Sequence, residues 1–252
     1  MSVKLVLEPR VTLLAAPMFE MPEHLAIESR GMATDSELLG EYAGRLCYMS
    51  QANPAGRTTG EYLENILKLG HGSVLEHSQV TFLLEGISRS CTHELVRHRA
   101  GCAYSQLSQR YVDESACEFV VPPAIKQFPE LLDEFVAQMR SAQVAYVVAS
   151  NRLFERYEYI TDKTHRRKVA REAARAVLPN ATETKVVMSA NLRAWRTVLE
   201  LRCGEGAERE IRRLALMILA ELKLIAPAVF ADFDVYDLED GSHAAKPTFH
   251  KV

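Results

Sequence analysis

The densest group of side chains able to bind an anion lies in residues 93–111, HELVRHRAGCAYSQLSQRY. It contains three arginines, two histidines and two serines: Arg97, Arg99, Arg110, His93, His98, Ser105 and Ser108. Guanidinium groups offer paired N–H donors that match phosphate oxygens, and small polar residues let a backbone approach a ligand closely. A solvated helix end followed by an exposed loop explains the same composition equally well.

The histidines in this region do not have the spacing of a metal site. His93 and Glu94 begin like the zinc protease motif, but the next histidine, His98, follows five residues after the first. Zinc needs both histidines on one helical face, which a spacing of four provides and a spacing of five does not. His71 and His77 could share a face of a strand, but no third ligand is evident. We therefore expect no metal.

A second basic cluster occupies residues 162–175, DKTHRRKVAREAAR. Arg167, Arg171 and Arg175 recur every four residues and form one edge of a predicted helix. A solvated basic face is the ordinary interpretation. Arg175 differs because alanines and Val177 surround it, which predicts a buried position. A buried arginine requires a partner, and a phosphate is a suitable one.

A third cluster is the segment 191–202, NLRAWRTVLELR. Three helical turns take about 10.8 residues, so Asn191 and Arg202 share one face, with Trp195 and Val198 between them. An apolar stripe with polar ends could cover a flat ring and bind its edges. A core face with two capping polar residues fits the same pattern.

The elements that must position these clusters alternate irregularly along the chain. We predict strands at 4–15, 73–85, 117–121, 184–189 and 229–237, and helices at 35–49, 60–69, 88–99, 129–159, 162–178, 191–202 and 207–225, with a loop at 100–111. This order predicts a mixed α/β (α+β) fold with long helices and a mixed sheet, without a Rossmann motif or a P-loop. We expect one catalytic domain over 1–252, with a core at about 4–238 and a short C-terminal tail, 239–252.

Bulk properties narrow the possible functions. The 252 residues carry a net charge of -3, so a generally polyanion-binding protein is not expected. No apolar stretch is long enough to span a membrane, and the charged N-terminus is a poor signal peptide. Five irregularly spaced cysteines are typical of a reducing cytoplasm. We expect Cys47, Cys91 and Cys117 to be small buried hydrophobic residues, and neither Cys102 nor Cys203 to act as a nucleophile.

In this order the three clusters resemble the flavin-dependent thymidylate synthases. The resemblance rests on Arg97-His98-Arg99 followed by SQLSQR (105–110), and extends through GHGSVLEH (70–77), GISRSCTHELVRHR (86–99), AARAVLPNATET (173–184) and NLRAWR (191–196). Thr197 and Gly206 stand where close relatives carry histidine. The matching segments cover most of the chain.

The resemblance implies a homotetramer and assigns site residues. FAD would be bound by residues like Ser73, Arg97, His98, Arg99, Gln106, Asn191, Leu192 and Arg193, with His71 near the flavin and the folate. Deoxyuridylate (dUMP) would be bound by residues like Glu94, Leu95, Val96, Arg97, Gln106, Leu107, Ser108, Gln109, Arg110, Arg175 and Arg202. Arg202 matches the arginine that polarises the uracil.

The implied reaction is the reductive methylation of dUMP to dTMP. NADPH would reduce the FAD, and 5,10-methylenetetrahydrofolate would supply the carbon. A hydroxymethylase of the same family, in which water replaces hydride, is the nearest alternative. An RNA-binding module using the basic helix is a more distant one, disfavoured by the acidic net charge and the lack of an aromatic, basic sheet. We therefore expect a cytoplasmic enzyme that acts on small molecules.

Overall fold

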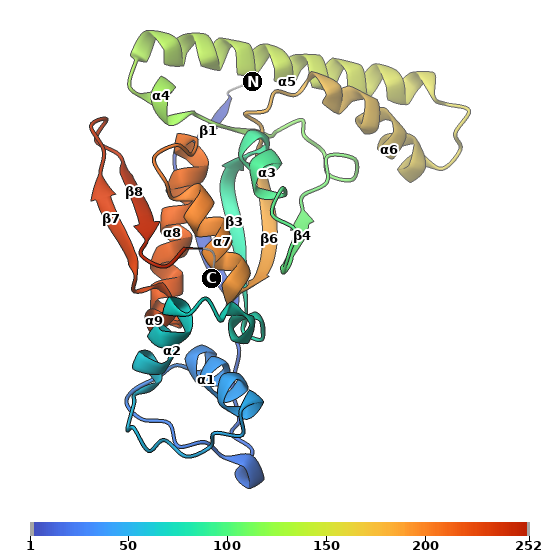
Figure 1. The fold of residues 1–252 in the computed structure, drawn as a ribbon. Helices are drawn as coiled ribbons and strands as arrows, with labels where there is room; N and C mark the ends of the chain where they lie inside the picture. Colours follow the sequence, from blue (N-terminus) through green and yellow to red (C-terminus); the bar gives the residue numbers. More distant parts are fainter. Residues whose placement is uncertain (1–2, 251–252) are drawn as a thin grey trace. The chain divides into compact units, whose positions relative to one another are not determined.

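A computed structural model describes residues 3–250 (Figure 1). The strands are β1 (Lys4–Val6), β2 (Arg10–Ala15), β3 (Gln79–Ser88), β4 (Cys102–Gln106), β5 (Glu118–Val120), β6 (Glu183–Asn191), β7 (Phe233–Asp237) and β8 (His243–Pro247). The α-helices are α1 (Asp35–Cys47), α2 (Thr59–Lys68), α3 (Arg89–Leu95), α4 (Pro123–Lys126), α5 (Pro129–Arg156), α6 (Lys163–Ala174), α7 (Leu192–Arg202), α8 (Arg209–Ile225) and α9 (Pro227–Phe230). Three short 3-10 helices complete the set: η1 (Glu23–Leu25), η2 (Gly72–Glu76) and η3 (Arg175–Val177).

The strands form three sheets. The largest has the order β2-β3-β6-β4, while β1 pairs with β5 in parallel and β7 pairs with β8 in an antiparallel hairpin. These sheets and the long helices confirm the predicted mixed α/β class. The chain divides into two compact units that alternate along the sequence. The expectation of a single catalytic domain stays a prediction.

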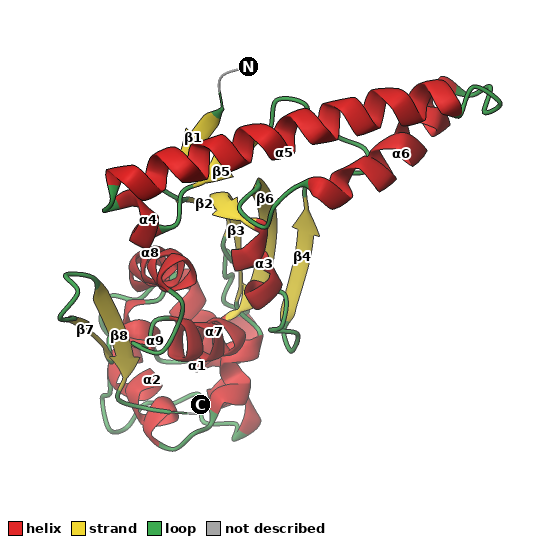
Figure 2. Cartoon of the chain, turned by 90° about the horizontal axis from the view of Figure 1, so that it is seen from above, coloured by secondary structure: helices red, strands yellow, loops and turns green. Residues whose placement is uncertain are grey.

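The first unit comprises residues 3–10, Leu84–Val96 and Ser105–Val186. Its most extended feature is the pair α5 and α6, which lie side by side in both views (Figures 1 and 2). Phe119 and Tyr146 are fully buried in this unit, and the Tyr146 hydroxyl accepts a hydrogen bond from the Glu114 backbone N–H at 3.2 Å. The Asp162 side chain caps α6 by accepting from the Thr164 N–H at 2.8 Å, which fixes where this basic helix begins.

The second unit comprises residues 11–83, Arg97–Tyr104 and 187–250. Its part of β3, residues 79–83, alternates buried residues with exposed or partly exposed ones, as expected of a strand with one covered face. Trp195 of α7 meets Phe82 edge to face at 5.5 Å, and its indole N–H donates to the Val80 carbonyl at 3.2 Å. These two contacts fix the position and rotation of α7, the helix that carries Asn191 at its start and Arg202 at its end.

Several predicted boundaries were wrong at points where the backbone changes direction. The single strand expected at 4–15 is two strands separated by residues 7–9, because Pro9 cannot donate to a sheet. In the strand expected at 73–85, the first residues instead form η2. The loop expected at 100–111 contains β4, and the helix expected at 88–99 ends at Leu95.

The C-terminal region also differs from the sequence-based expectation. The strand expected at 229–237 begins only at Phe233, because Pro227 starts the short helix α9. Residues 243–247, placed in the expected tail, form β8 and bury Ala244 and Ala245. Among residues 3–250, no helix is both long and apolar enough to cross a bilayer.

Candidate active site

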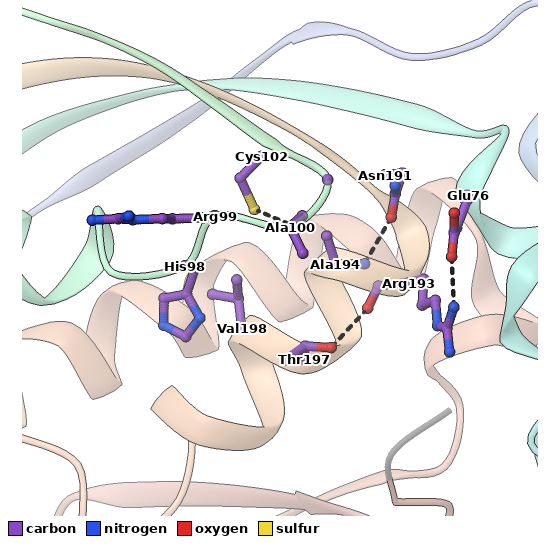
Figure 3. Close-up of a pocket in the computed structure, with 11 residues that line it drawn as sticks. Glu76, His98, Arg99, Ala100, Cys102, Asn191, Arg193, Ala194, Thr197 and Val198 are labelled. Carbon is purple, nitrogen blue, oxygen red and sulfur yellow. Dashed lines mark hydrogen bonds and ion pairs between the residues drawn. The ribbon is translucent and has the colours of Figure 1, made fainter.

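A cavity of about 320 Å³ in the second unit contains the largest set of the predicted flavin-binding residues (Figure 3). We call it the His98 pocket. One wall is α7, with Ala194, Thr197 and Val198, and the other is the segment from His98 to Cys102. Figure 3 shows Arg99 near one end of the pocket and the ion pair between Arg193 and Glu76 at the other. Basic and amide donors therefore surround a cavity with a partly apolar wall.

The start of α7 is joined to the opposite wall by Asn191. Its side-chain oxygen accepts from the Ala194 N–H at 2.8 Å, which caps the helix, and its own backbone N–H donates to the Gly101 carbonyl at 3.2 Å. Gly101 has a φ of +69°, and a Cβ there would lie 2.6 Å from the Asn191 amide nitrogen and 3.0 Å from the Ala194 Cβ. Only glycine fits this turn, which explains why it follows Arg97-His98-Arg99.

The end of α7 is joined to the same pocket by Arg202. Its Nε donates a hydrogen bond to Nε2 of His98 at 3.0 Å. Burial, and then the positive charges of Arg202 and Arg97, lower the pKa of His98 from 6.5 to about 4. The imidazole is therefore neutral at physiological pH. The Tyr104 hydroxyl donates to the His98 carbonyl at 2.8 Å and fixes the backbone there.

A second cavity in the same unit, of about 350 Å³, is lined by the predicted residues His71 and Ser73. It also contains Tyr48, Tyr62 and Arg193. Arg193 lines both this cavity and the His98 pocket, because its side chain lies between them and pairs with Glu76. His71 directly precedes η2 and Ser73 lies within it, so neither belongs to a strand as predicted. Both side chains are exposed.

The predicted nucleotide-binding residues 106–110 belong to the first unit. The Gln106 amide donates to Thr92 at 3.1 Å and to Thr184 at 3.3 Å, so its side chain is held between α3 and β6. The Leu107 N–H donates to the Lys185 carbonyl at 2.9 Å, and the Ser108 hydroxyl accepts from the Arg110 N–H. Gln109 is buried, and its side-chain nitrogen has no hydrogen-bond partner in the described structure.

Arg175 lies beside another arginine of the first unit, Arg89. The pKa of Arg89 is lowered by burial and by repulsion from Arg175, while Glu114 opposes the shift. The Arg89 guanidinium also donates to the Leu107 carbonyl at 3.5 Å. Two guanidinium groups whose positive charges repel each other favour an anionic ligand.

The prediction that Arg175 is buried was wrong. Arg175 is only partly covered, and its neighbours Ala173, Ala176 and Val177 are exposed. The reason is that α6 ends at Ala174 and Arg175 begins η3. Arg175 therefore does not lie on the buried helix face that the surrounding alanines predicted.

Arg167, Lys168 and Arg171 of α6 line an open cavity of about 510 Å³, which we call the α6 pocket. Its lining residues are Arg110, Tyr111, Asp162, Thr164, His165, Arg167, Lys168 and Arg171. Arg110 pairs with Glu172 at 2.6 Å and Arg171 with Asp113 at 3.0 Å. The Lys168 ammonium lies 4.8 Å from the centre of the Tyr111 ring, and its hydrogen bond to Tyr111 lowers the pKa of that phenol.

The other predicted contacts have different environments. Leu95 and Leu192 are fully buried, so their side chains belong to the core and a ligand would meet only their backbone. Arg97 and Val96 are exposed, and Glu94 is partly exposed. Glu94 to Val96 lie in the first unit, whereas Arg97, His98 and Arg99 lie in the second.

Three site residues were missed by sequence reasoning: Glu76, Arg89 and Tyr104. Glu76 and Arg89 lie inside the segments 70–77 and 86–99, which carry the family resemblance. No spacing rule singled out these two residues within the segments. Tyr104 was hidden because residues 100–111 were expected to be a loop, whereas it lies in β4.

Burial separates the cysteines. Cys203 is completely buried, which raises its pKa to about 12, and Cys91 and Cys117 are also buried, as predicted. The pKa of Cys102 is raised by burial too. The prediction that Cys47 is buried was wrong. Cys47 is exposed at the C-terminal end of α1 and lines the second cavity, which also contains His71 and Ser73.

Comparison with known proteins gives a consistent result. The profile of the family described as "Thymidylate synthase complementing protein" matches residues 31–228. The chain is 48% identical over 238 residues to proteins named flavin-dependent thymidylate synthase from Mycolicibacterium gilvum and from Mycobacterium marinum, with 94% of each chain covered. Among solved structures, a UMP/dUMP methylase, PolB, from Streptomyces cacaoi bound with 5-Br dUMP has a TM-score of 0.66. At 20% identity, over 91% of this chain and 96% of that one, this likeness establishes the fold.

Proposed function

The chain belongs to the family of flavin-dependent thymidylate synthases, and we propose that it converts dUMP to dTMP by reductive methylation. The balanced reaction takes dUMP, 5,10-methylenetetrahydrofolate, NADPH and a proton to dTMP, tetrahydrofolate and NADP⁺. The single observation that carries the assignment is the His98 pocket, in which basic donors and the start of a helix surround a cavity beside an oriented arginine.

The His98 pocket fits a flavin dinucleotide in its chemistry. Arg99 and Arg193 provide cationic donors, and the N-terminal end of α7 adds a positive dipole suited to a pyrophosphate. Ala194 and Val198 offer apolar surface for a flat ring system. When bound, FAD would supply hydride transfer. In this proposal Arg97, His98, Asn191, Leu192 and Ser73 complete the flavin site, with His71 near the folate.

The residues of the first unit suit the nucleotide. Arg89 and Arg175 form a cationic pair for a phosphate, and the buried Gln109 amide has an unused donor for a carbonyl oxygen. Gln106 to Arg110, Glu94 to Val96 and Arg97 are proposed to enclose the rest of the nucleotide. Among them, the cations Arg97 and Arg110 favour the dianionic phosphate, and the amides of Gln106 and Gln109 suit the polar edge of a pyrimidine.

Arg202 is the proposed activating residue. A cation facing the pyrimidine oxygens stabilises the negative charge that develops when the N3 proton is lost. Because the guanidinium keeps its charge throughout the physiological pH range, it acts as a fixed electrostatic group and not as a proton donor. The hydrogen bond to His98 gives this group a defined direction.

We also propose a cytoplasmic homotetramer. Phe128, Leu131, Val144 and Val148 expose apolar area around α5 and its start, which association with further copies would cover. The irregular, unpaired cysteines agree with a reducing compartment. Light scattering of the purified protein tests the assembly directly, and a monomer at micromolar concentration contradicts it.

The function is tested by product identification. Purified protein is incubated with dUMP, methylenetetrahydrofolate and NADPH, and the nucleotides are separated and weighed by mass spectrometry. We expect dTMP, formed only when NADPH is present, and a yellow protein that releases FAD on denaturation. A 5-hydroxymethyl product that forms without NADPH would assign the chain to the hydroxymethylating alternative.

A further inference from the structure

In the hydrogen bond between His98 and Arg202, the arginine is the donor and the histidine is the acceptor. A histidine that only contacted the flavin would not need this hydrogen bond. Arginine can only donate, so the Nε2 atom of His98 must accept the 3.0 Å hydrogen bond from Arg202 Nε. The imidazole is then neutral and carries its proton on Nδ1. Its surroundings agree, because the charged groups acting on it are the cations Arg97 and Arg202.

We propose that His98 is a positioning residue that orients the guanidinium of Arg202 through a neutral imidazole acceptor. A hydrogen bond through Nε sets the plane of the guanidinium, and therefore the direction of the two terminal Nη groups that suit the oxygens of a pyrimidine. The backbone of His98 is itself held by the Tyr104 hydroxyl. The inference rests on the proposed function, because it concerns the role given there to Arg202.

The same geometry excludes two other roles for His98. It is not a general acid, because with a pKa of about 4 it carries no extra proton near neutral pH. It is not a general base through Nε2, because the lone pair of that nitrogen already accepts from Arg202. A role limited to flavin binding remains the competing explanation, and the variants below separate the two.

The test compares His98→Gln with His98→Leu. Glutamine places a neutral amide oxygen about as far along the side chain as Nε2, whereas leucine has no acceptor. With FAD added to saturation, we expect His98→Gln to keep kcat within about fivefold, and His98→Leu to lose about a hundredfold, the scale of a misplaced catalytic group. KM for dUMP should change less than kcat in both, because the phosphate contacts proposed for Arg89 and Arg175 are left intact.

A double-mutant cycle shows whether the effect passes through Arg202. In an Arg202→Ala background, His98→Leu should cost no further turnover, because the group that it orients is absent. Equal turnover of His98→Gln and His98→Leu, or a full additional loss in the Arg202→Ala background, overturns the inference. If wild type itself makes no dTMP, the proposed function fails instead, so the two failures are distinguishable.

A measurement on the wild-type holoenzyme covers the case in which the variants cannot bind FAD. NMR of protein labelled at histidine nitrogen should show His98 neutral, protonated on Nδ1 and unprotonated on Nε2, at neutral pH. The signal is assigned by its loss in His98→Gln, which requires only folded protein. A cationic imidazole or the opposite tautomer at neutral pH overturns the proposal without any activity assay.

Discussion

The His98 pocket and the α6 pocket are both basic, but their cations are held in different ways. In the His98 pocket, Arg202 donates to a half-buried neutral histidine, and the side chain of Asn191 is fixed as a helix cap. In the α6 pocket, Arg110 and Arg171 pair with the exposed carboxylates of Glu172 and Asp113. Arg202 and Asn191 are therefore held in place before a ligand arrives, whereas Arg193 of the same pocket pairs with an exposed carboxylate, Glu76.

The difference shows that arginine content alone does not identify a catalytic site. Exposed ion pairs contribute little and exchange partners easily, so Arg110 can turn from Glu172 to an arriving anion, whereas Arg171 is also held by the Tyr111 carbonyl at 2.8 Å. A neutral acceptor such as His98 orients the guanidinium of Arg202 without itself adding a negative charge. A guanidinium held by a histidine therefore distinguishes the His98 pocket from the α6 pocket, in which Arg110 and Arg171 pair with carboxylates.

Arg202→Ala should break the His98 pocket most severely. Loss of a fixed group that stabilises developing charge typically lowers kcat by about 10² to 10³, and we expect a loss on that scale. FAD content, measured from visible absorbance, should remain near wild type. Arg213→Ala, which removes an exposed arginine from α8, is the matched control and should leave turnover unchanged. Near-normal turnover of Arg202→Ala would contradict the activation role.

Arg175→Ala should affect the first unit in a different way. A hydrogen bond to a charged group is worth about 1.5–3 kcal/mol, so dUMP affinity should fall roughly ten- to a hundredfold. FAD affinity should change much less. Titration calorimetry with dUMP measures the effect, and Arg152→Ala on the exposed face of α5 is the control. An unchanged dissociation constant in a folded variant would remove Arg175 from the phosphate site.

Gly101→Ala sharpens the comparison, because it disturbs the ordered pocket without removing a donor. The new Cβ would displace the Asn191 amide, and we expect FAD affinity to fall about tenfold, equivalent to one lost hydrogen bond. Gly241→Ala is the matched control. It has a similar φ of +76° with no atom within 4 Å, so it adds only backbone strain of about 1 kcal/mol. Equal loss of FAD in both variants would show that strain alone is responsible.

The sequence predicted the class of the fold and most helices, because caps and apolar periodicity are local signals. Thr34 and Thr58 form capping boxes with Glu37 and Glu61, and the corresponding helices lie where they were expected. The strand β4 was missed because it is short and lies between Gly101 and several small polar residues, and its strand character comes from pairing within the sheet.

The site could be predicted only as a set of segments. The resemblance singled out His98 and Arg202 separately, but the hydrogen bond between them joins residues 104 positions apart, which no spacing in the sequence predicts. Its direction depends on the neutral state of His98, which in turn depends on burial. The expectation that Arg175 is buried was also wrong for a reason that the local sequence does not contain. The alanines around Arg175 could not show that α6 ends at Ala174, one residue before it.

The smallest effect is expected from the two cysteines of the second unit that lie near basic residues. A nucleophilic thiol must form a thiolate, yet burial raises the pKa of Cys203 to about 12 and also raises the pKa of Cys102. Cys102→Ser should therefore keep dTMP formation within about twofold, because serine can keep the hydrogen bond to the Ala100 carbonyl. Cys203→Ser puts a hydroxyl into a fully buried position, so Cys203→Ala is compared with it to separate a loss of stability from a loss of chemistry. Turnover is measured at saturating substrates together with FAD content and melting temperature. A loss of several orders of magnitude with FAD retained, in either cysteine, would mean that the second unit supplies a covalent nucleophile and that oriented charge from Arg202 is not enough.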